Sequence, residues 1–307
     1  MDTQELLAIA QAVVDEAEAL FVRGVGTRER HEKAPGEYVT DVDVRIEEYA
    51  RTMLIQLTGI PVYGEERGGS LGAEPVWVID PIDGTANYAV GNPLCSILLS
   101  LLVDRRPVLA VSSLPLLGRR LTAVEGGGLM INGAPVARLA AQDKGADNGA
   151  DKDSSKDIAQ VGFSSLSSQT RCEYSTEARH RLLADLSRTH LRPRVTGSVG
   201  VDLSFAAQGI FAGAISFSPH AWDNAAGALL VGEAGGVVTD TEGQPWTPDS
   251  SGLVVGDHVT HALLLSTMRT ALSSGAPCAA EQHEEQYVEY HEEQHAGQQH
   301  PKETAER

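Results

Sequence analysis

The sequence has little of what marks disulfide-stabilised proteins. It contains three cysteines in 307 residues, at positions 95, 172 and 278, and no two of them are close enough for a CxxC pair. Small secreted domains that depend on disulfides have many cysteines, and zinc sites usually have paired ones. The cysteine pattern therefore excludes a disulfide framework and predicts a protein of a reducing compartment, the cytoplasm.

The sequence is also short of basic residues and of long apolar runs. Its 24 lysines and arginines face 42 acidic residues, which gives a formal net charge of -18. A nucleic-acid backbone is bound by clustered Lys and Arg, so nucleic acid is not an expected partner. The most apolar stretch, residues 94–103, is too short to span a bilayer, and the acidic N-terminus does not resemble a secretory signal. We expect a soluble protein without a membrane partner.

Hydrophobic residues make up 42% of the chain, enough for a large core, and their spacing predicts both helices and strands. A long amphipathic helix is predicted over 3–22, with its apolar stripe ending at Phe21. The other predicted helices are 43–58, 176–188, 199–208, 222–234 and 259–273, and the predicted strands are 60–63, 76–79, 95–103, 107–114, 213–217, 237–238 and 253–255. Glycine-rich segments at 126–128 and 132–133 are typical of hairpin turns.

Two polar segments divide the chain. Residues 141–157 are almost devoid of apolar side chains and are interpreted as a linker or surface insertion between an α+β half, 1–140, and an α/β half, 158–275. Residues 276–307 are rich in Glu, Gln and His, and we expect them to be a disordered tail. Within this tail, His291 and His295 form an HExxH pattern, but a catalytic zinc site needs that pattern on a packed helix.

The segment Trp77-Val-Ile-Asp-Pro-Ile-Asp-Gly-Thr85 carries the most chemical information. An apolar strand leads into Asp80 and Asp83, which are predicted to converge across a proline-containing turn. Mg²⁺ prefers carboxylates, water and phosphate oxygens, and the carbonyl of Ile82 lies between the two acids. Gly84 and Thr85 could offer backbone N–H groups to a phosphate, especially if a helix begins there. The alternative is an ordinary Asp-Gly turn after a strand.

Three further acidic points have simple alternatives of their own. Glu65 and Glu66 follow a short strand, and adjacent glutamates on a loop are usually solvated. Asp223 stands where an apolar helix begins, as a helix N-cap would. Asp43 lies near the start of another helix, where an acid stabilises the helix dipole.

Taken together, these points carry a resemblance that none of them carries alone. Asp43, Glu65-Glu66, Asp80-Pro-Ile-Asp-Gly-Thr85 and Trp222-Asp223-Asn-Ala-Ala, in this order and spacing, resemble the motifs of the inositol monophosphatase family of lithium-sensitive, magnesium-dependent phosphatases. The resemblance runs from about residue 5 to 270. It includes the segments Arg194-Val-Thr-Gly-Ser198, Val201-Asp202-Leu203 and Gly232-Glu-Ala-Gly-Gly236.

The resemblance implies a metal site and a catalytic pair. A first metal would be held by Glu65, Asp80 and the carbonyl of Ile82, and a second by Asp80, Asp83 and Asp223. A third, weaker Mg²⁺ would rest on Glu65, so that each site takes two to three ions, with inhibition by Li⁺ expected. Thr85 and Asp43 would orient the attacking water and help to deprotonate it. Glu66 would contact the metal ligands but would not bind the metal itself.

For the substrate, the resemblance implies a pocket with two departures from the family pattern. Gly84 and Thr85 would face the phosphate, Asp83 would touch a hydroxyl, and Gly197, Ser198 and Val199 would line the sugar side. Ser216 stands where inositol-specific members commonly have glutamate, and Ala212 stands where many members have aspartate. A serine hydroxyl replaces an acid there, which changes what the pocket can recognise.

The resemblance also implies an α/β fold of alternating helix and sheet layers, the fold of sugar phosphatases like inositol monophosphatase, and a possible homodimer. The expected activity is hydrolysis of a small phosphorylated metabolite, with inositol monophosphate first. Histidinol phosphate, fructose 1,6-bisphosphate and 3'-phosphoadenosine phosphates are the alternatives. The rival class is a non-catalytic metal-binding scaffold, which usually lacks one of the acids.

Overall fold

The computed structural model describes residues 1–27, 30–34, 37–139, 159–166 and 173–272. Met1–Gly275 form one compact unit, and the remaining residues, Ala276–Arg307, lie outside the description. The linker predicted at 141–157 and the tail predicted at 276–307 both fall on residues outside the described part, so both remain predictions.

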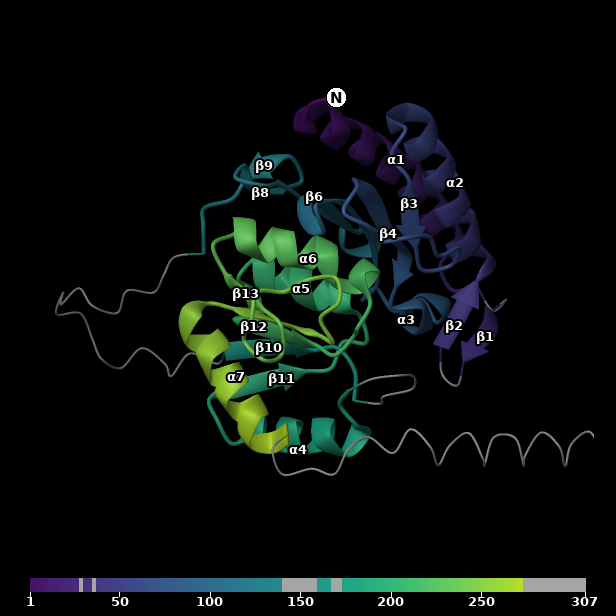
Figure 1. Cartoon of the computed structure of the whole chain (residues 1–307). Helices are drawn as coiled ribbons and strands as arrows, with labels where there is room; N and C mark the ends of the chain where they lie inside the picture. The colour runs from purple at the N-terminus through teal and green to yellow at the C-terminus, as the bar shows by residue number, and fades with distance from the viewer. Residues whose placement is uncertain (28–29, 35–36, 140–158, 167–172, 273–307) are drawn as a thin grey trace, which may run out of the picture. The chain divides into compact units, whose positions relative to one another are not determined.

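The described part contains seven α-helices, one short 3-10 helix (η1) and fourteen strands (Figure 1). The helices are α1 (Thr3–Gly24), α2 (Asp41–Thr58), α3 (Thr85–Ala89), η1 (Pro115–Leu117), α4 (Thr176–Ser187), α5 (Val199–Ala207), α6 (Ala221–Glu233) and α7 (His258–Leu272). The strands are β1 (Arg30–Ala34), β2 (Glu37–Thr40), β3 (Val62–Gly64), β4 (Val76–Asp83), β5 (Ser96–Val103), β6 (Arg106–Leu114), β7 (Arg119–Val124), β8 (Gly128–Ile131), β9 (Ala134–Pro135), β10 (Ala159–Phe163), β11 (Leu191–Arg194), β12 (Gly213–Ser216), β13 (Val237–Thr239) and β14 (Leu253–Gly256).

Two larger sheets organise these elements. A seven-stranded sheet has the order β3-β4-β5-β6-β7-β8-β9, and a five-stranded sheet has the order β11-β10-β12-β14-β13. In the first sheet β3 pairs with β4 in parallel and every other pair is antiparallel. In the second, β10 is parallel to β11 and β12, while β14 is antiparallel to its neighbours. The glycine segments at 126–128 and 132–133 join β7 to β8 and β8 to β9, as predicted.

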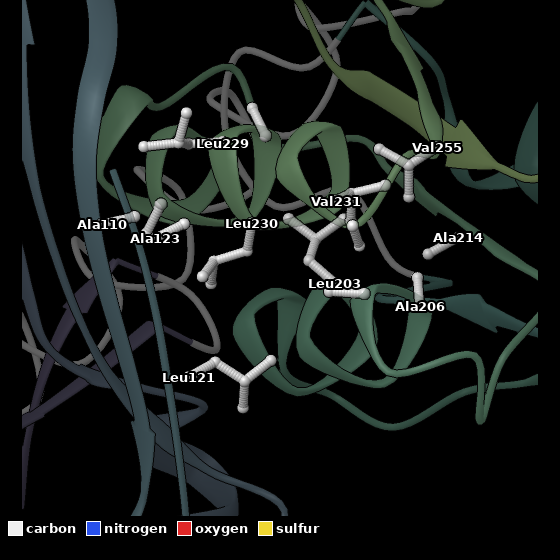
Figure 2. Close-up of a cluster of buried hydrophobic side chains, with 14 of the residues drawn as sticks. Ala110, Leu121, Ala123, Leu203, Ala206, Ala214, Leu229, Leu230, Val231 and Val255 are labelled. Carbon is white, nitrogen blue, oxygen red and sulfur yellow. The ribbon is translucent and has the colours of Figure 1, made fainter. Parts of the chain in front are cut away.

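Helices α5 and α6 lie between the two sheets. Their apolar side chains pack on Ala110, Leu121 and Ala123 from one sheet and on Ala214 and Val255 from the other (Figure 2). Helices α1 and α2 cover the opposite face of the seven-stranded sheet, and α4 and α7 cover that of the five-stranded sheet (Figure 1). The layers therefore alternate between helix and sheet, which confirms the predicted fold class.

The helix pattern at the start of the chain is confirmed in detail. All seven apolar residues of the predicted stripe in α1 are buried, and Asp2 and Glu5 close its N-terminus as a capping box. In α2 the apolar residues do not account for the buried face, because Leu57 is 44% exposed whereas Asp43 and Glu47 are fully buried. The buried face of α2 thus carries two carboxylates that an apolar pattern does not reveal.

Strand β4 differs from the prediction in a way that matters for the site. The strand does not end at Asp80 but continues through Pro81 to Asp83, buried along its whole length. Its pairing with β5 shifts register between Asp80 and Asp83, so the proline lies in a bulge, one of the few places where a sheet accepts one.

No helix in the described residues has the length and apolar character needed to cross a membrane.

Candidate functional site

Three carboxylates from distant parts of the chain meet at the boundary between β4 and α6. Asp80, Asp83 and Asp223 each offer an oxygen within 4.8 Å of the others. Asp80 and Asp83 come from β4, and Asp223 lies in the first turn of α6, which packs on β4 through Ala221 and Ala225. Asp223 is not the N-cap that the simple alternative proposed, because that position belongs to His220.

The bulge in β4 explains how Asp80 and Asp83 reach the same side. Residues three apart in a regular strand point to opposite faces of the sheet. Here Asp80 pairs with Leu98 and Asp83 with Ser96, so β4 advances three residues while β5 advances two. Opposite residues of an antiparallel pair share a face, and Leu98 and Ser96 lie on one face. The extra residue therefore turns both carboxylates toward α5 and α6.

Asp83 is held by the N-terminus of α5. Its carboxylate accepts hydrogen bonds from the hydroxyls of Ser96 (3.0 Å) and Ser198, and from the backbone N–H groups of Val199 (3.1 Å) and Gly200 (2.9 Å). Burial raises the pKa of Asp83, while these hydrogen bonds act in the opposite direction. Asp83 is thus a fixed acceptor at a helix N-terminus.

Asp80 is held differently. Its Oδ1 accepts a hydrogen bond from the N–H of Ile82 at 3.0 Å, and its side chain also hydrogen-bonds with that of Asp223. Burial raises the pKa of Asp80 well above its usual value, and the negative charges of Glu65, Asp223 and Asp83 raise it further. A cation among these carboxylates would remove the repulsion, so the chemistry of the donors fits a hard divalent metal ion.

Glu65 reaches this cluster from the edge of the seven-stranded sheet. It directly follows β3, which runs parallel to β4, and its N–H donates to the carbonyl of Ile79 at 3.3 Å. Among the neighbouring charges, that of Glu65 has the largest effect on the pKa of Asp80. Glu65 is thus close enough for its charge to act on Asp80, but it does not belong to the group of Asp80, Asp83 and Asp223 whose oxygens lie within 4.8 Å of one another.

Thr85 and Asp43 form the second part of the site. Helix α3 begins at Thr85, after Gly84 in a left-handed conformation with φ of 83°. The Thr85 hydroxyl lies 2.9 Å from the carbonyl of Ile82 and 3.3 Å from Oδ1 of Asp43. Asp43 also caps its own helix by accepting from the N–H of Thr40 at 2.9 Å. Asp43 thus lies in the first turn of its helix, as its simple alternative requires, and also contacts Thr85, the residue with which it is predicted to pair.

The predicted substrate residues divide into two groups. A Cβ on Gly84 would lie 3.1 Å from Cβ of Ser198 and 3.3 Å from the carbonyl of Gly197, so these segments touch. Val199 adjoins them and binds Asp83 through its backbone. Ser216 comes from a different element: it is buried in β12, and its hydroxyl accepts from the N–H of Ser218 at 3.2 Å.

Several residues that contact the site are not predicted from the sequence. Ser96 and Ser218 donate to Asp83 and Asp223, respectively, and Asn87 joins the carbonyls of Leu94 and Thr196 at 2.7 and 2.8 Å. Glu47 and Arg51 bind the loop that carries Glu65. Only Glu47 has a signal in the sequence, since it lies four residues after Asp43 on the same face of a predicted helix.

The raised pKa of Asp80 predicts how metal affects stability at different pH. Above the unfolded pKa, near 3.8, and below the folded one, the folded protein holds a proton that the unfolded chain has lost, so stability falls as pH rises. Mg²⁺ binds the ionised form, so its stabilising effect should grow with pH. We expect Mg²⁺ to raise the melting temperature more at pH 8 than at pH 5, measured by calorimetry against EDTA. Equal shifts at both pH values would contradict this prediction.

The comparison with known proteins agrees with this geometry. The sequence profile of the inositol monophosphatase family matches residues 2–273. A protein named probable inositol 1-monophosphatase ImpA, from Mycobacterium tuberculosis, is 43% identical over 264 residues, which cover 86% of this chain and 93% of that protein. A fructose-1,6-bisphosphatase/inositol-1-monophosphatase from Aquifex aeolicus is 30% identical over 78% of this chain and 84% of its own length.

Solved structures agree on the fold. The IMPase of Thermotoga maritima superposes with a TM-score of 0.74 at 22% identity, covering 88% of this chain and 99% of that one. At such identity the likeness concerns the fold, whereas the sequence profile and the closer relatives concern the family. This chain belongs to the inositol monophosphatase family and is a phosphoric monoester hydrolase.

Proposed function

We propose that this enzyme hydrolyses a small phosphate monoester in a Mg²⁺-dependent reaction, with inositol monophosphate as the first candidate substrate. The observation that carries the proposal is the meeting of Asp80, Asp83 and Asp223, with Glu65 close enough to act on the pKa of Asp80. Carboxylates crowded in a buried place repel one another unless cations neutralise them.

The donor set supports magnesium as the cofactor, with two to three ions per site. Glu65, Asp80 and the carbonyl of Ile82 would hold one ion, and Asp80, Asp83 and Asp223 a second. All are hard oxygen donors, and no cysteine or histidine is among them. The metal would supply charge for the phosphoryl oxygens and lower the pKa of water. Li⁺ is proposed to inhibit by competing for the same oxygens.

The chain itself would position and deprotonate the nucleophile. The Thr85 hydroxyl has two acceptors, Asp43 and the carbonyl of Ile82, but only one proton to give. Its oxygen can therefore accept a hydrogen bond from a water molecule while its proton moves toward Asp43. The buried Asp43 carboxylate is fixed for this task by its hydrogen bonds to Thr40. Attack by water needs no covalent intermediate on a serine or cysteine.

The proposed substrate rests on the small residues around Gly84 and on the names of the related proteins. Gly84, Thr85, Gly197, Ser198 and Val199 are proposed to receive the phosphate and the polyol, and Asp83 a hydroxyl. Ser216 is proposed to shape the far end of the pocket, although its hydroxyl already binds the backbone of Ser218. The name of the Aquifex aeolicus relative favours fructose 1,6-bisphosphate as a second candidate. A cytoplasmic homodimer is proposed on family resemblance.

Phosphate release tests this proposal directly. The purified enzyme is assayed with inositol, histidinol, fructose and 3'-phosphoadenosine phosphates, each with Mg²⁺, with EDTA and with Mg²⁺ plus millimolar Li⁺. We expect inositol monophosphate to give the highest kcat/KM, EDTA to abolish release, and Li⁺ to inhibit it. Equal release in EDTA would reject the metal mechanism, and no release from any substrate would favour a metal-binding scaffold.

A further inference from the structure

Helix α2 contains an ion pair outside the acid cluster that the mechanism above does not use. Glu47 is fully buried, and its carboxylate lies 2.9 Å from the guanidinium of Arg51, one turn further along the helix. Asp43, which binds Thr85, lies one turn before Glu47. The buried face of α2 thus carries two acids in succession, of which only the first has a proposed role.

The other partners of this pair lie on the loop that carries Glu65. The Glu47 carboxylate accepts from the N–H groups of Glu66 at 2.7 Å and Arg67 at 3.0 Å. Arg51 donates to the carbonyl of Val62 and to that of Gly68, both at 2.7 Å. Glu47 and Arg51 therefore bind residues 62–68 at both ends and in the middle.

The loop is built to lie directly against this carboxylate. Gly64 and Gly68 exchange backbone hydrogen bonds of 3.1 and 3.0 Å, which closes the loop around Glu65. A Cβ on Gly64 would lie 2.3 Å from Oε1 of Glu47, so any side chain there would have to displace the Glu47 carboxylate. This close contact between Gly64 and Glu47 fixes the position of the Gly64 backbone, and Glu65 is the next residue.

We propose that Glu47, oriented by Arg51, is a positioning residue that holds the Glu65–Glu66 backbone so that the Glu65 carboxylate faces Asp80. The ion pair adds little net stability, because the desolvation of the buried Glu47 carboxylate offsets its attraction to the partly exposed Arg51. Four of the hydrogen bonds of this pair end on residues 62–68, so its main effect is on the geometry of that loop. This inference rests on the proposed function, in which Glu65 is a metal ligand.

The variant Glu47→Gln tests the inference. The N–H groups of Glu66 and Arg67 bind different oxygens of Glu47, Oε2 and Oε1, and glutamine has an NH₂ donor in place of one of them, so one N–H group would face another donor. We expect the backbone amides of residues 65–67 in the metal-free protein to exchange with deuterium at least about tenfold faster. Calorimetric Mg²⁺ affinity should fall by about 10–100-fold, as for other groups that orient metal ligands. At saturating Mg²⁺, kcat should stay within a few-fold of wild type.

The neighbouring Glu48 supplies a matched control. Its exposed carboxylate pairs with the side chain of Arg67 on the same loop. Glu48→Gln should leave both amide exchange and Mg²⁺ affinity within twofold of wild type. Should Glu47→Gln fail to fold, Arg51→Lys keeps the charge but cannot reach both carbonyls, and the same changes are expected at smaller size.

The outcomes separate this inference from the proposed function. Unchanged amide exchange and unchanged Mg²⁺ affinity in a folded Glu47→Gln or Arg51→Lys variant would overturn the positioning role. A wild-type protein that binds no Mg²⁺ would instead overturn the proposed function, while amide exchange would still report whether Glu47 holds the loop. Faster exchange without any loss of affinity would mean that the pair orders the loop but does not position Glu65, which also rejects the inference.

Discussion

Replacing Asp80 with asparagine is expected to abolish phosphate release while making the metal-free protein more stable. Burial and the negative charges of three neighbouring carboxylates, Glu65, Asp223 and Asp83, make an ionised Asp80 costly in the metal-free protein. Asparagine keeps the volume and removes the charge, so the metal-free protein at pH 8 should melt a few degrees higher. Under the proposed function Asp80 is a ligand shared by two metal ions, so its loss is expected to remove several kcal/mol of transition-state stabilisation, or about 10³-fold in kcat.

One substitution is thus expected to abolish phosphate release and to raise the melting temperature of the metal-free protein. These opposite effects distinguish a metal ligand from an acid with a structural role only. Asp202 provides the control. It is also buried and burial raises its pKa, but its carboxylate accepts a hydrogen bond from the hydroxyl of Thr196 at 2.7 Å. Asp202→Asn should keep calorimetric Mg²⁺ binding, whereas Asp80→Asn should lose it. An Asp80→Asn enzyme that retains a tenth of the wild-type activity, or that melts at a lower temperature than wild type in EDTA, would contradict the assignment of Asp80 as a metal ligand.

Regular periodicity explains what could be predicted of the fold. The stripe of α1 follows helical spacing throughout, and every residue predicted to be buried is buried. Strand β11 was missed because Leu191–Arg194 has one apolar residue besides its proline, and its place at a sheet edge needs no more. Strand β10 was missed because Ala159–Phe163 is short and ambiguous in isolation.

The acids of the site could be found from sequence, but their support could not. Asp43, Glu65, Asp80, Asp83 and Asp223 each had an ordinary local explanation, and only their combined order pointed to one site. The bulge that turns Asp80 and Asp83 to one face depends on the register with β5, which no local pattern encodes. The hold of α5 on Asp83 and of Glu47 on the Glu65 loop joins residues far apart in sequence.

Removal of the Thr85 hydroxyl is expected to slow catalysis without weakening metal binding. Valine has nearly the same volume as threonine but cannot accept a proton from water or pass one to Asp43. General base assistance contributes about 10²–10⁴-fold, so Thr85→Val should lower kcat by about 10²-fold or more. KM and calorimetric Mg²⁺ affinity should change little, and Thr85→Ser should recover most of the rate.

A double-mutant cycle with Asp43→Asn decides whether the two residues act as one unit. If the proton passes from water through Thr85 to Asp43, removing either residue breaks the same path, and the double variant should be no slower than the slower single one. Asp43→Asn should also cost about 1 kcal/mol of stability, because Asp43 belongs to the capping box with Thr40. Urea unfolding measures that loss separately from kcat. Effects that multiply in the double variant would mean that Asp43 acts on catalysis by a route independent of Thr85, and the 3.3 Å contact between them would then be structural.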